Sequence, residues 1–157
     1  VWFVAFSPDG KLLASASHGT VRVWSTKTWA EVSTLQHGTR STSVAFSPDG
    51  KFLASALWGE AKVWSTEDWA EVWTFRDHFS DFCNKFLSAQ FGPKDEIVAF
   101  SSDQRVCVWR CGRDTPERTF FARSPVLCIA VTPAPREGSR VWFACGDKGG
   151  NVYMLGD

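Results

Sequence analysis

The sequence predicts an all-β protein built from about four small antiparallel sheets of one kind. The 157-residue chain repeats itself at a spacing of 40, and 22 of the 31 positions from Val4 to Thr34 are identical 40 residues later. Within each repeat, short apolar runs rich in Val, Phe, Leu and Trp alternate with turn residues, which is typical of strands joined by tight turns. Four such runs in about 40 residues indicate one four-stranded sheet per repeat.

The first repeat shows the expected order of strands. The Ser-Pro-Asp-Gly run at 7–10 is a type I turn signature, because proline presets φ at the second position and glycine accepts the fourth. This turn closes a hairpin between the first two strands. The predicted strands are Val4–Phe6, Leu12–Ser17, Val21–Trp24 and Glu31–Leu35. The second and third are apolar on both faces, as expected for a sheet packed between two neighbours.

The third and fourth repeats keep this order in weaker form. In the third, Phe-Gly-Pro at 91–93 replaces the turn and Val106–Trp109 is the third strand. In the fourth, Val-Thr-Pro at 131–133 and Val152–Leu155 take these places. The expected sheets are about 1–36, 37–77, 78–122 and 123–157, within one domain, and the last lacks its outer strand.

These motifs resemble the tryptophan-aspartate (WD) repeat β-propellers. The shared strings are Phe-Ser-Pro-Asp-Gly-Lys, Leu-Ala-Ser-Ala and Val-x-Val-Trp, in the family's order and spacing. The resemblance implies four-stranded blades stacked around an axis, with partners docking on the loops of the narrower, top face. The chain departs from the family because Ser25, Ser65 and Arg110 follow the strand tryptophans in place of Asp, and because the Gly-His pair is missing.

In the family, a His before the first strand, a Ser or Thr on the second, an Asp in the next turn and the Trp of the third strand form a buried hydrogen-bonded group. The structural repeat residues that the resemblance assigns here are Trp24, Trp64, Trp109, His37 and Asp103. In the first two repeats, His18 and Trp58 stand in the Asp position. Because orphaned buried polar groups cost about 1–3 kcal/mol each, we expect packing to hold these blades more than polar links.

The number of repeats bears on whether the ring closes. A propeller of about seven or eight blades needs roughly 280 to 320 residues, about twice this chain. Three arrangements remain open: a fragment of a longer propeller, two chains paired into an eight-bladed ring, and an open or four-bladed unit. We expect Trp2, Phe3 and Phe143 to lie on open blade faces, and open blade edges to allow self-association.

Composition excludes several classes of function. Lys plus Arg and Asp plus Glu number 17 each, so nucleic acid is not expected as a partner. No nucleophile elbow or phosphate-binding loop occurs and the three His are scattered, so we expect no catalysis, no metal and no cofactor. Five Cys cannot all pair, and no apolar run approaches the length of about 18 residues that spans a bilayer. We therefore expect no membrane partner and an intracellular setting, cytoplasmic or nuclear.

Candidate partner-binding residues fall on the loops of the expected top face. His18 and Trp58 lie in turns between the second and third strands, and Trp is a residue that often dominates binding energy. Alternatively, Trp58 fills the space left by the lost Asp. The full candidate set is His18, Arg40, Trp58, Phe79, Phe82, Gln104, Arg105 and Lys148.

The loop from Arg76 to Phe86 holds the five residues by which the third repeat is longer. The spacing of Phe79, Phe82, Cys83 and Phe86 predicts a short amphipathic helix. This helix either seals the loop onto its own blade or binds a partner.

On the opposite face, Trp29 and Trp69 either brace the fourth strand of their repeat or form an apolar patch. The preferred interpretation of the whole chain is a non-catalytic protein–protein interaction scaffold that docks peptides or domains on its top-face loops. One alternative is a structural or assembly segment of a larger propeller or oligomer with no binding site of its own. A weaker alternative is nucleic-acid binding.

Overall fold

The computed structural model describes residues 1–57, 60–76, 86–92, 96–101, 104–113, 115–131 and 142–156. All regular elements in this part are strands, and it holds no helix long and apolar enough to cross a membrane. The strands are β1 (Phe3–Phe6), β2 (Leu12–Ser25), β3 (Glu31–Phe46), β4 (Phe52–Leu57), β5 (Glu60–Ser65), β6 (Glu71–Arg76), β7 (Phe86–Phe91), β8 (Glu96–Ser101), β9 (Arg105–Arg110), β10 (Arg118–Phe121), β11 (Val126–Val131), β12 (Trp142–Asp147) and β13 (Val152–Gly156).

The strand β2 is folded back on itself. A straight strand would separate Ser15 from Trp24 by about 30 Å, yet Trp24 Nε1 donates a hydrogen bond to Ser15 Oγ at 3.1 Å. Gly19 makes the reversal with a φ of 73°, and the hydroxyls of Ser17 and Thr20 lie 3.1 Å apart beside it. The two arms of β2 are therefore the second and third strands predicted for the first repeat.

The strand β3 belongs to two sheets. Its first part pairs with β2, with Leu35 opposite Val21, and its last part pairs with β4, with Val44 opposite Ser55. Ladder hydrogen bonds consequently link β1 to β6 in one order, although these segments make up two four-stranded units. Blades 1 and 2 reach four strands each because β2 supplies two strands of blade 1 and β3 supplies one strand to each of the two blades.

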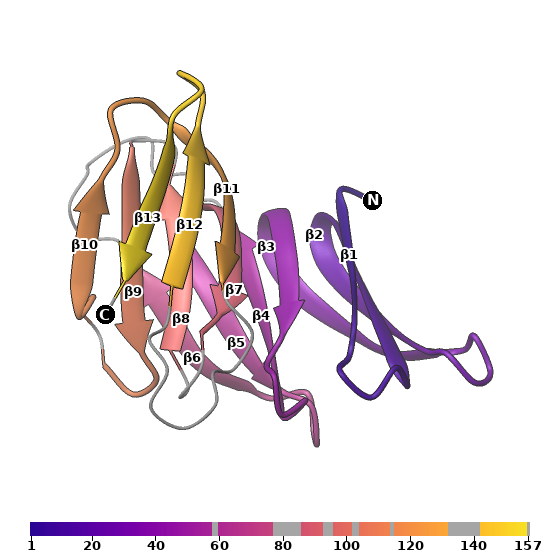
Figure 1. The fold of residues 1–157 in the computed structure, drawn as a ribbon. Coiled ribbons are helices and arrows are strands. Elements are labelled where there is room, and N and C mark those ends of the chain that lie inside the picture. Colours follow the sequence, from indigo (N-terminus) through magenta and orange to yellow (C-terminus); the bar gives the residue numbers. More distant parts are fainter. Residues whose placement is uncertain are drawn as a thin grey trace.

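Four blades result, and every pairing within them is antiparallel. Blade 1 is β1, both arms of β2 and the start of β3; blade 2 is the end of β3 with β4, β5 and β6; blade 3 is β7–β10; blade 4 is β11–β13. The inner strands β1, β3, β7 and β11 are successive neighbours. Blades 1 and 4 are therefore the two ends of this row. Figure 1 shows blade 1 on the right and blade 4 in front of blade 3. The predicted all-β partial propeller, with three strands in its last described blade, is confirmed.

The hydrophobic core lies in three layers between neighbouring blades, which explains why both faces of the middle blades are apolar. The layer between blades 1 and 2 contains Ala14, Ala16, Val21, Val23, Leu35, Val44, Leu53 and Trp64. The layer between blades 2 and 3 contains Ala54, Ala56, Ala61, Val63, Phe75, Ala89, Phe91, Cys107 and Trp109. The layer between blades 3 and 4 contains Val106, Val108, Val126, Ile129, Phe143 and Cys145.

The Ser-Pro-Asp-Gly turns have the predicted geometry. In blade 1, Gly10 N donates to Ser7 O at 2.9 Å, and Gly10 has a φ of 71°, which glycine adopts without steric cost. The Ser7 hydroxyl donates to Asp9 Oδ1 at 2.7 Å and accepts from Leu12 N at 2.9 Å. Ser47 makes the same two bonds in blade 2. Each buried serine hydroxyl is thus satisfied within its own turn.

Blades 1 and 2 also keep one bond of the family's buried polar group. The Trp24–Ser15 bond recurs in blade 2, where Trp64 Nε1 donates to Ser55 Oγ at 3.0 Å. One polar link thus survives in each of these two blades, and the expectation that packing holds them more than polar links stays a prediction. The indole has a single donor and the hydroxyl accepts it, so the bond persists without the His and the Asp. Blade 3 has Ala99 at the serine position.

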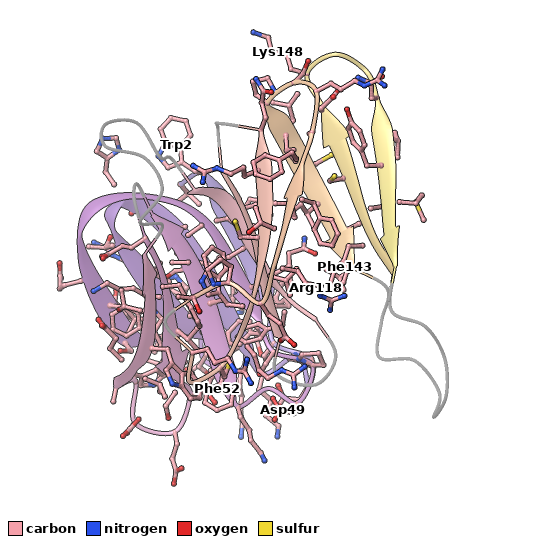
Figure 2. All side chains as sticks on the ribbon, turned by 90° about the vertical axis from the view of Figure 1, so that its left-hand side faces the viewer. Trp2, Asp49, Phe52, Arg118, Phe143 and Lys148 are labelled. Atoms are coloured by element: carbon pink, nitrogen blue, oxygen red, sulfur yellow. The ribbon has the colours of Figure 1, made fainter. Side chains whose placement is uncertain are left out.

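The prediction that Phe143 lies on an open face is wrong. Phe143 is opposite Val131 in the register of β11 and β12, is 1% exposed, and packs against blade 3 (Figure 2). Trp2 and Phe3 are exposed as expected.

The predicted helix before the third blade does not reach Phe86, which begins β7 opposite Ser101. Phe79, Phe82 and Cys83 lie outside the described residues.

Candidate interaction surface

The candidate surface lies at the end of the blades where β2 turns at Gly19 and where β12 connects to β13. Figure 2 shows Trp2 and Lys148 at this end, and Asp49 at the opposite end. We call this end the top rim and define it by Trp2, His18, Gln104, Arg105, Arg123 and Lys148. Its residues come from blades 1, 3 and 4 and from the segment that joins blades 3 and 4.

In blade 1 the top rim carries two rings in contact. Trp2 N donates to Ala16 O at 2.8 Å, which fixes the chain just before β1. The Trp2 ring is tilted by 39° against the imidazole of His18, with 6.5 Å between centroids, and it is exposed. A tryptophan already held against another ring loses little conformational freedom on binding, a property of binding hot spots.

In blade 3 the top rim is built from a constrained turn. Gln104 has a φ of 74°, and its carbonyl accepts the N–H of Ala122 at 2.8 Å. Arg105 begins β9 opposite Phe121. The backbone is therefore fixed from both sides, while the Gln104 side chain is exposed and Arg105 is half-buried.

In blade 4 a buried carboxylate organises the turn. Asp147 accepts from Asn151 Nδ2 at 3.1 and 2.9 Å, from Asn151 N at 2.9 Å and from the Tyr153 hydroxyl at 2.8 Å. These hydrogen bonds, led by the Asn151 side chain, hold the pKa of Asp147 below its usual value. The Tyr153 hydroxyl in turn accepts the N–H of Arg123 at 3.0 Å. The network ties the turn to the segment before β11.

The segment before β11 presents two cations on the top rim. Lys148 N donates to Pro125 O at 2.8 Å, and a Cβ added at Gly149 would lie 3.0 Å from Ser124 Oγ, so the turn packs closely on this segment. Arg123 and Lys148 are exposed, and within the described residues neither forms an ion pair. The exposed cations Arg123 and Lys148 can therefore pair with acidic groups of a partner.

Sequence reasoning missed Arg123 and Trp2 as members of the rim. The signal for Arg123 was its place in the connection between two repeats, the same place as the predicted Arg40. Arg40 lies in β3 opposite His18. Its side chain and that of His37 are not among those described. Trp58, Phe79, Phe82 and Asp103 also lie outside the described residues.

At the opposite end, a cavity of about 260 Å³ separates the two Ser-Pro-Asp-Gly turns, and Asp9 and Asp49 line it. The hydrogen bond from the Ser7 hydroxyl, with help from Lys11, lowers the pKa of Asp9 to about 2. Burial raises the pKa of Asp49, but hydrogen bonds from Ser47 and Lys51 outweigh it and leave a lowered value. Both carboxylates thus accept hydrogen bonds from residues of their own turns. Among the described residues no three His, Cys, Asp or Glu side chains gather as metal ligands would.

Trp29 and Trp69 have the same strained backbone, with φ of 55° and 59°, but different surroundings. Trp69 packs against the layer between blades 1 and 2, whereas Trp29 is exposed. The bracing interpretation therefore fits Trp69, whereas the Trp29 side chain is exposed to solvent.

Comparison with known families classifies the first two repeats. The family model described as "WD domain, G-beta repeat" matches residues 1–25 and 29–65, the segments that form blade 1 and most of blade 2. The matched residues of blades 1 and 2 are therefore WD repeats, as their motifs predict. Binding of other proteins is the general role of WD repeats, and they are typically non-catalytic.

Solved structures share the fold of this chain. One match is to hydrazine synthase of Kuenenia stuttgartiensis, with a TM-score of 0.79 and 16% sequence identity. The match covers 98% of this chain and 45% of the other, so this chain spans less than half of that protein's length. At this identity the likeness concerns the fold alone. A search of curated protein sequences finds no significant match.

Proposed function

We propose that the whole chain is a WD-repeat protein and acts as a non-catalytic scaffold that binds partner peptides or domains on its top rim. The observation that supports this most is the convergence at one end of a preformed Trp2–His18 contact with the cations Arg105, Arg123 and Lys148. Main-chain bonds hold each of these turns, so a partner would meet positions that need little reordering. The expected partner carries an apolar or aromatic group for Trp2 and acidic groups for the cations.

An intracellular setting is part of this proposal. The four described cysteines, Cys107, Cys111, Cys128 and Cys145, are free thiols, which suits a reducing compartment. An assembly role without a separate binding site is the second candidate. It is favoured by the apolar residues exposed on the outer faces of blades 1 and 4.

Selection of displayed random peptides on the immobilised chain tests the scaffold proposal. The affinity of enriched peptides is then measured for Trp2→Ala and Lys148→Glu. The matched controls are Val72→Ala, an exposed apolar residue of β6 away from the rim, and Lys27→Glu, an exposed lysine at the opposite end. We expect a loss of about tenfold or more for the rim variants, as for hot-spot residues, and unchanged affinity for the controls.

Two results would count against the proposal. Peptides that lose affinity equally in rim and control variants would place binding elsewhere. Binding that falls steeply with salt, and that single-stranded DNA of random sequence competes away, would favour the nucleic-acid alternative.

A further inference from the structure

Each hydrophobic layer lies between two blades and has two walls, one from each blade. The exposed faces of blades 1 and 4 correspond to these two kinds of wall. Blade 2 presents Val44, Phe46, Leu53, Trp64 and Trp69 to blade 1. Val44 is 1% exposed and Leu53 and Trp64 are also buried. This wall of large side chains needs a neighbouring blade to cover it.

Blade 1 carries the same five residue types 40 positions earlier, with no described blade to cover them. These are Val4, Phe6, Leu13, Trp24 and Trp29. Val4 is 55% exposed and Phe6 is 62% exposed, whereas their counterparts lie in the layer between blades. Because blade 1 has the same side chains at the same strand positions as blade 2, it should pack against the same kind of surface that covers blade 2.

That surface is the wall of small side chains on the other side of each layer. In blade 2 it is formed where Ala54 pairs with Val63 and Ala56 pairs with Ala61. Blade 1 presents Ala14, Ala16, Val21 and Val23 to blade 2 in the same way. Small residues on two neighbouring strands leave room for the Trp and Leu of the next blade.

Blade 4 exposes a wall of this second kind. Ala144 pairs with Met154 and Gly146 pairs with Val152, the pairings that Ala54 and Ala56 make in blade 2. Val152 is 72% exposed and Met154 is 61% exposed. The described row of blades thus has a wall of large side chains at blade 1. At blade 4 it has a wall that keeps small residues at Ala144 and Gly146 and has Val152 and Met154 in the places of Ala61 and Val63. The two walls correspond to the two sides of one layer between blades.

We propose that two copies of this chain associate head to tail, with blade 1 of each copy packed on blade 4 of the other, to close a ring of eight blades. A contact between two unlike surfaces either closes into a ring or grows without limit. Pairing like faces would instead set Trp24 against Trp24, an arrangement found in none of the three internal layers.

The area involved favours closure over a single contact. Three to four strands spaced about 4.8 Å apart and about 20 Å long give each face a footprint of roughly 280–380 Å². One head-to-tail contact would bury roughly 560–760 Å² over both partners, below the size of stable protein interfaces, whereas a closed pair with two contacts reaches roughly 1,100–1,500 Å². The two contacts form together in the closed dimer and stabilise each other.

The mass of the chain in solution, measured by light scattering after size exclusion at micromolar concentration, is the first test. We expect a particle of twice 17.5 kDa. Two variants then separate the two faces. Val4→Glu places a charge on the blade 1 face, and Met154→Lys places the opposite charge on the blade 4 face. Phe121→Glu, on the outer strand of blade 3, is the control.

Head-to-tail association predicts that Val4→Glu and Met154→Lys are each monomeric alone and form a dimer when mixed, because the mixture restores one native contact and pairs the new charges in the other. Phe121→Glu should remain dimeric. Far-UV circular dichroism shows whether each variant keeps its strands. A wild-type monomer at all concentrations, larger assemblies than a dimer, or a Met154→Lys variant that stays dimeric would each overturn the proposal.

This association uses the blade faces and leaves the top rim free, so it goes beyond the scaffold function. Peptide selection can fail while the chain is a dimer, and the chain can be a monomer that binds peptides. The two proposals therefore fail separately.

Discussion

Phe75 of β6 and Trp109 of β9 join blade 2 to blade 3, with ring centroids 5.7 Å apart and ring planes at 48°. Both side chains are buried in the layer that contains the most residues of the three. An aromatic pair in this geometry contributes about 0.5–1.5 kcal/mol beyond the area that it buries. The contact links the outer strand of one blade to the third strand of the next.

Replacement of Phe75 by Ala should destabilise the protein by about 3–5 kcal/mol, because it removes a buried ring and leaves a cavity. Urea unfolding followed by tryptophan fluorescence measures the change. Phe121→Ala is the matched control, since Phe121 is exposed, and should change stability by less than about 0.5 kcal/mol. Equal losses of unfolding free energy in the two variants would show that the layer between blades 2 and 3 contributes little to stability.

Removal of the serine hydroxyl that accepts a tryptophan N–H tests the surviving polar links. Ser55→Ala should cost about 1–3 kcal/mol, because the buried Trp64 Nε1 loses its acceptor. In the monomer, Ser15→Ala should cost less, because Trp24 is only half-buried there and water can replace the hydroxyl. Thermal unfolding of both variants gives the comparison. A larger loss for Ser15→Ala would contradict this ordering.

The Tyr153 hydroxyl bridges Asp147 and the backbone of Arg123. Tyr153→Phe keeps the ring but removes this bridge, and we expect a loss of about 1–2 kcal/mol. The turn and the segment before β11 should also loosen together, seen as faster amide exchange at Arg123 and Lys148. Unchanged exchange at both positions would show that the bridge does not hold this part of the rim.

Stability should fall as the pH drops from about 4 toward 2. Asp9 has a pKa of about 2 in the folded protein, below its ordinary value, because the Ser7 hydroxyl and Lys11 stabilise the carboxylate. A lowered folded-state pKa adds stability that is fully present above the unfolded-state value of about 3.9 and is lost as the pH falls through the folded value. The urea midpoint of unfolding, measured at several pH values, reports this loss.

Asp9→Asn is the control for the pH series, because it keeps the shape of the turn and removes the titrating group. Its stability should depend less steeply on pH in this range than that of the wild type. Parallel curves would mean that other carboxylates cause the acid sensitivity.

Much of the fold could be predicted because the second repeat is a near copy of the first. The copy fixes strand order, the turn at Ser7–Gly10 and the faces of blades 1 and 2. The face of the sheet on which the Phe143 side chain lies could not be predicted in this way. Side chains alternate across a strand, so an uncertainty of one residue in the register reverses the face. In the eroded fourth repeat, the long connection before β12 hides that register.

The position of the top rim could be predicted from the sequence, but not all of the residues that form it. His18, Gln104 and Lys148 follow from the positions of turns between strands. Arg123 depends on a hydrogen bond from its own backbone to Tyr153, a residue 30 positions away. The contact between Trp2 and His18 depends on how the chain enters β1. Long-range pairs of this kind leave no pattern in a single sequence.

The shared strand β3 has a mechanical consequence. Its first half is the outermost strand of blade 1 and its second half the innermost strand of blade 2, without an intervening loop. Force applied to the amino-terminal blade would therefore be transmitted directly along an extended backbone to the centre of its neighbour. The first 76 residues should consequently yield as a single cooperative unit when pulled or heated, and a cut within β3 should disrupt both blades at once.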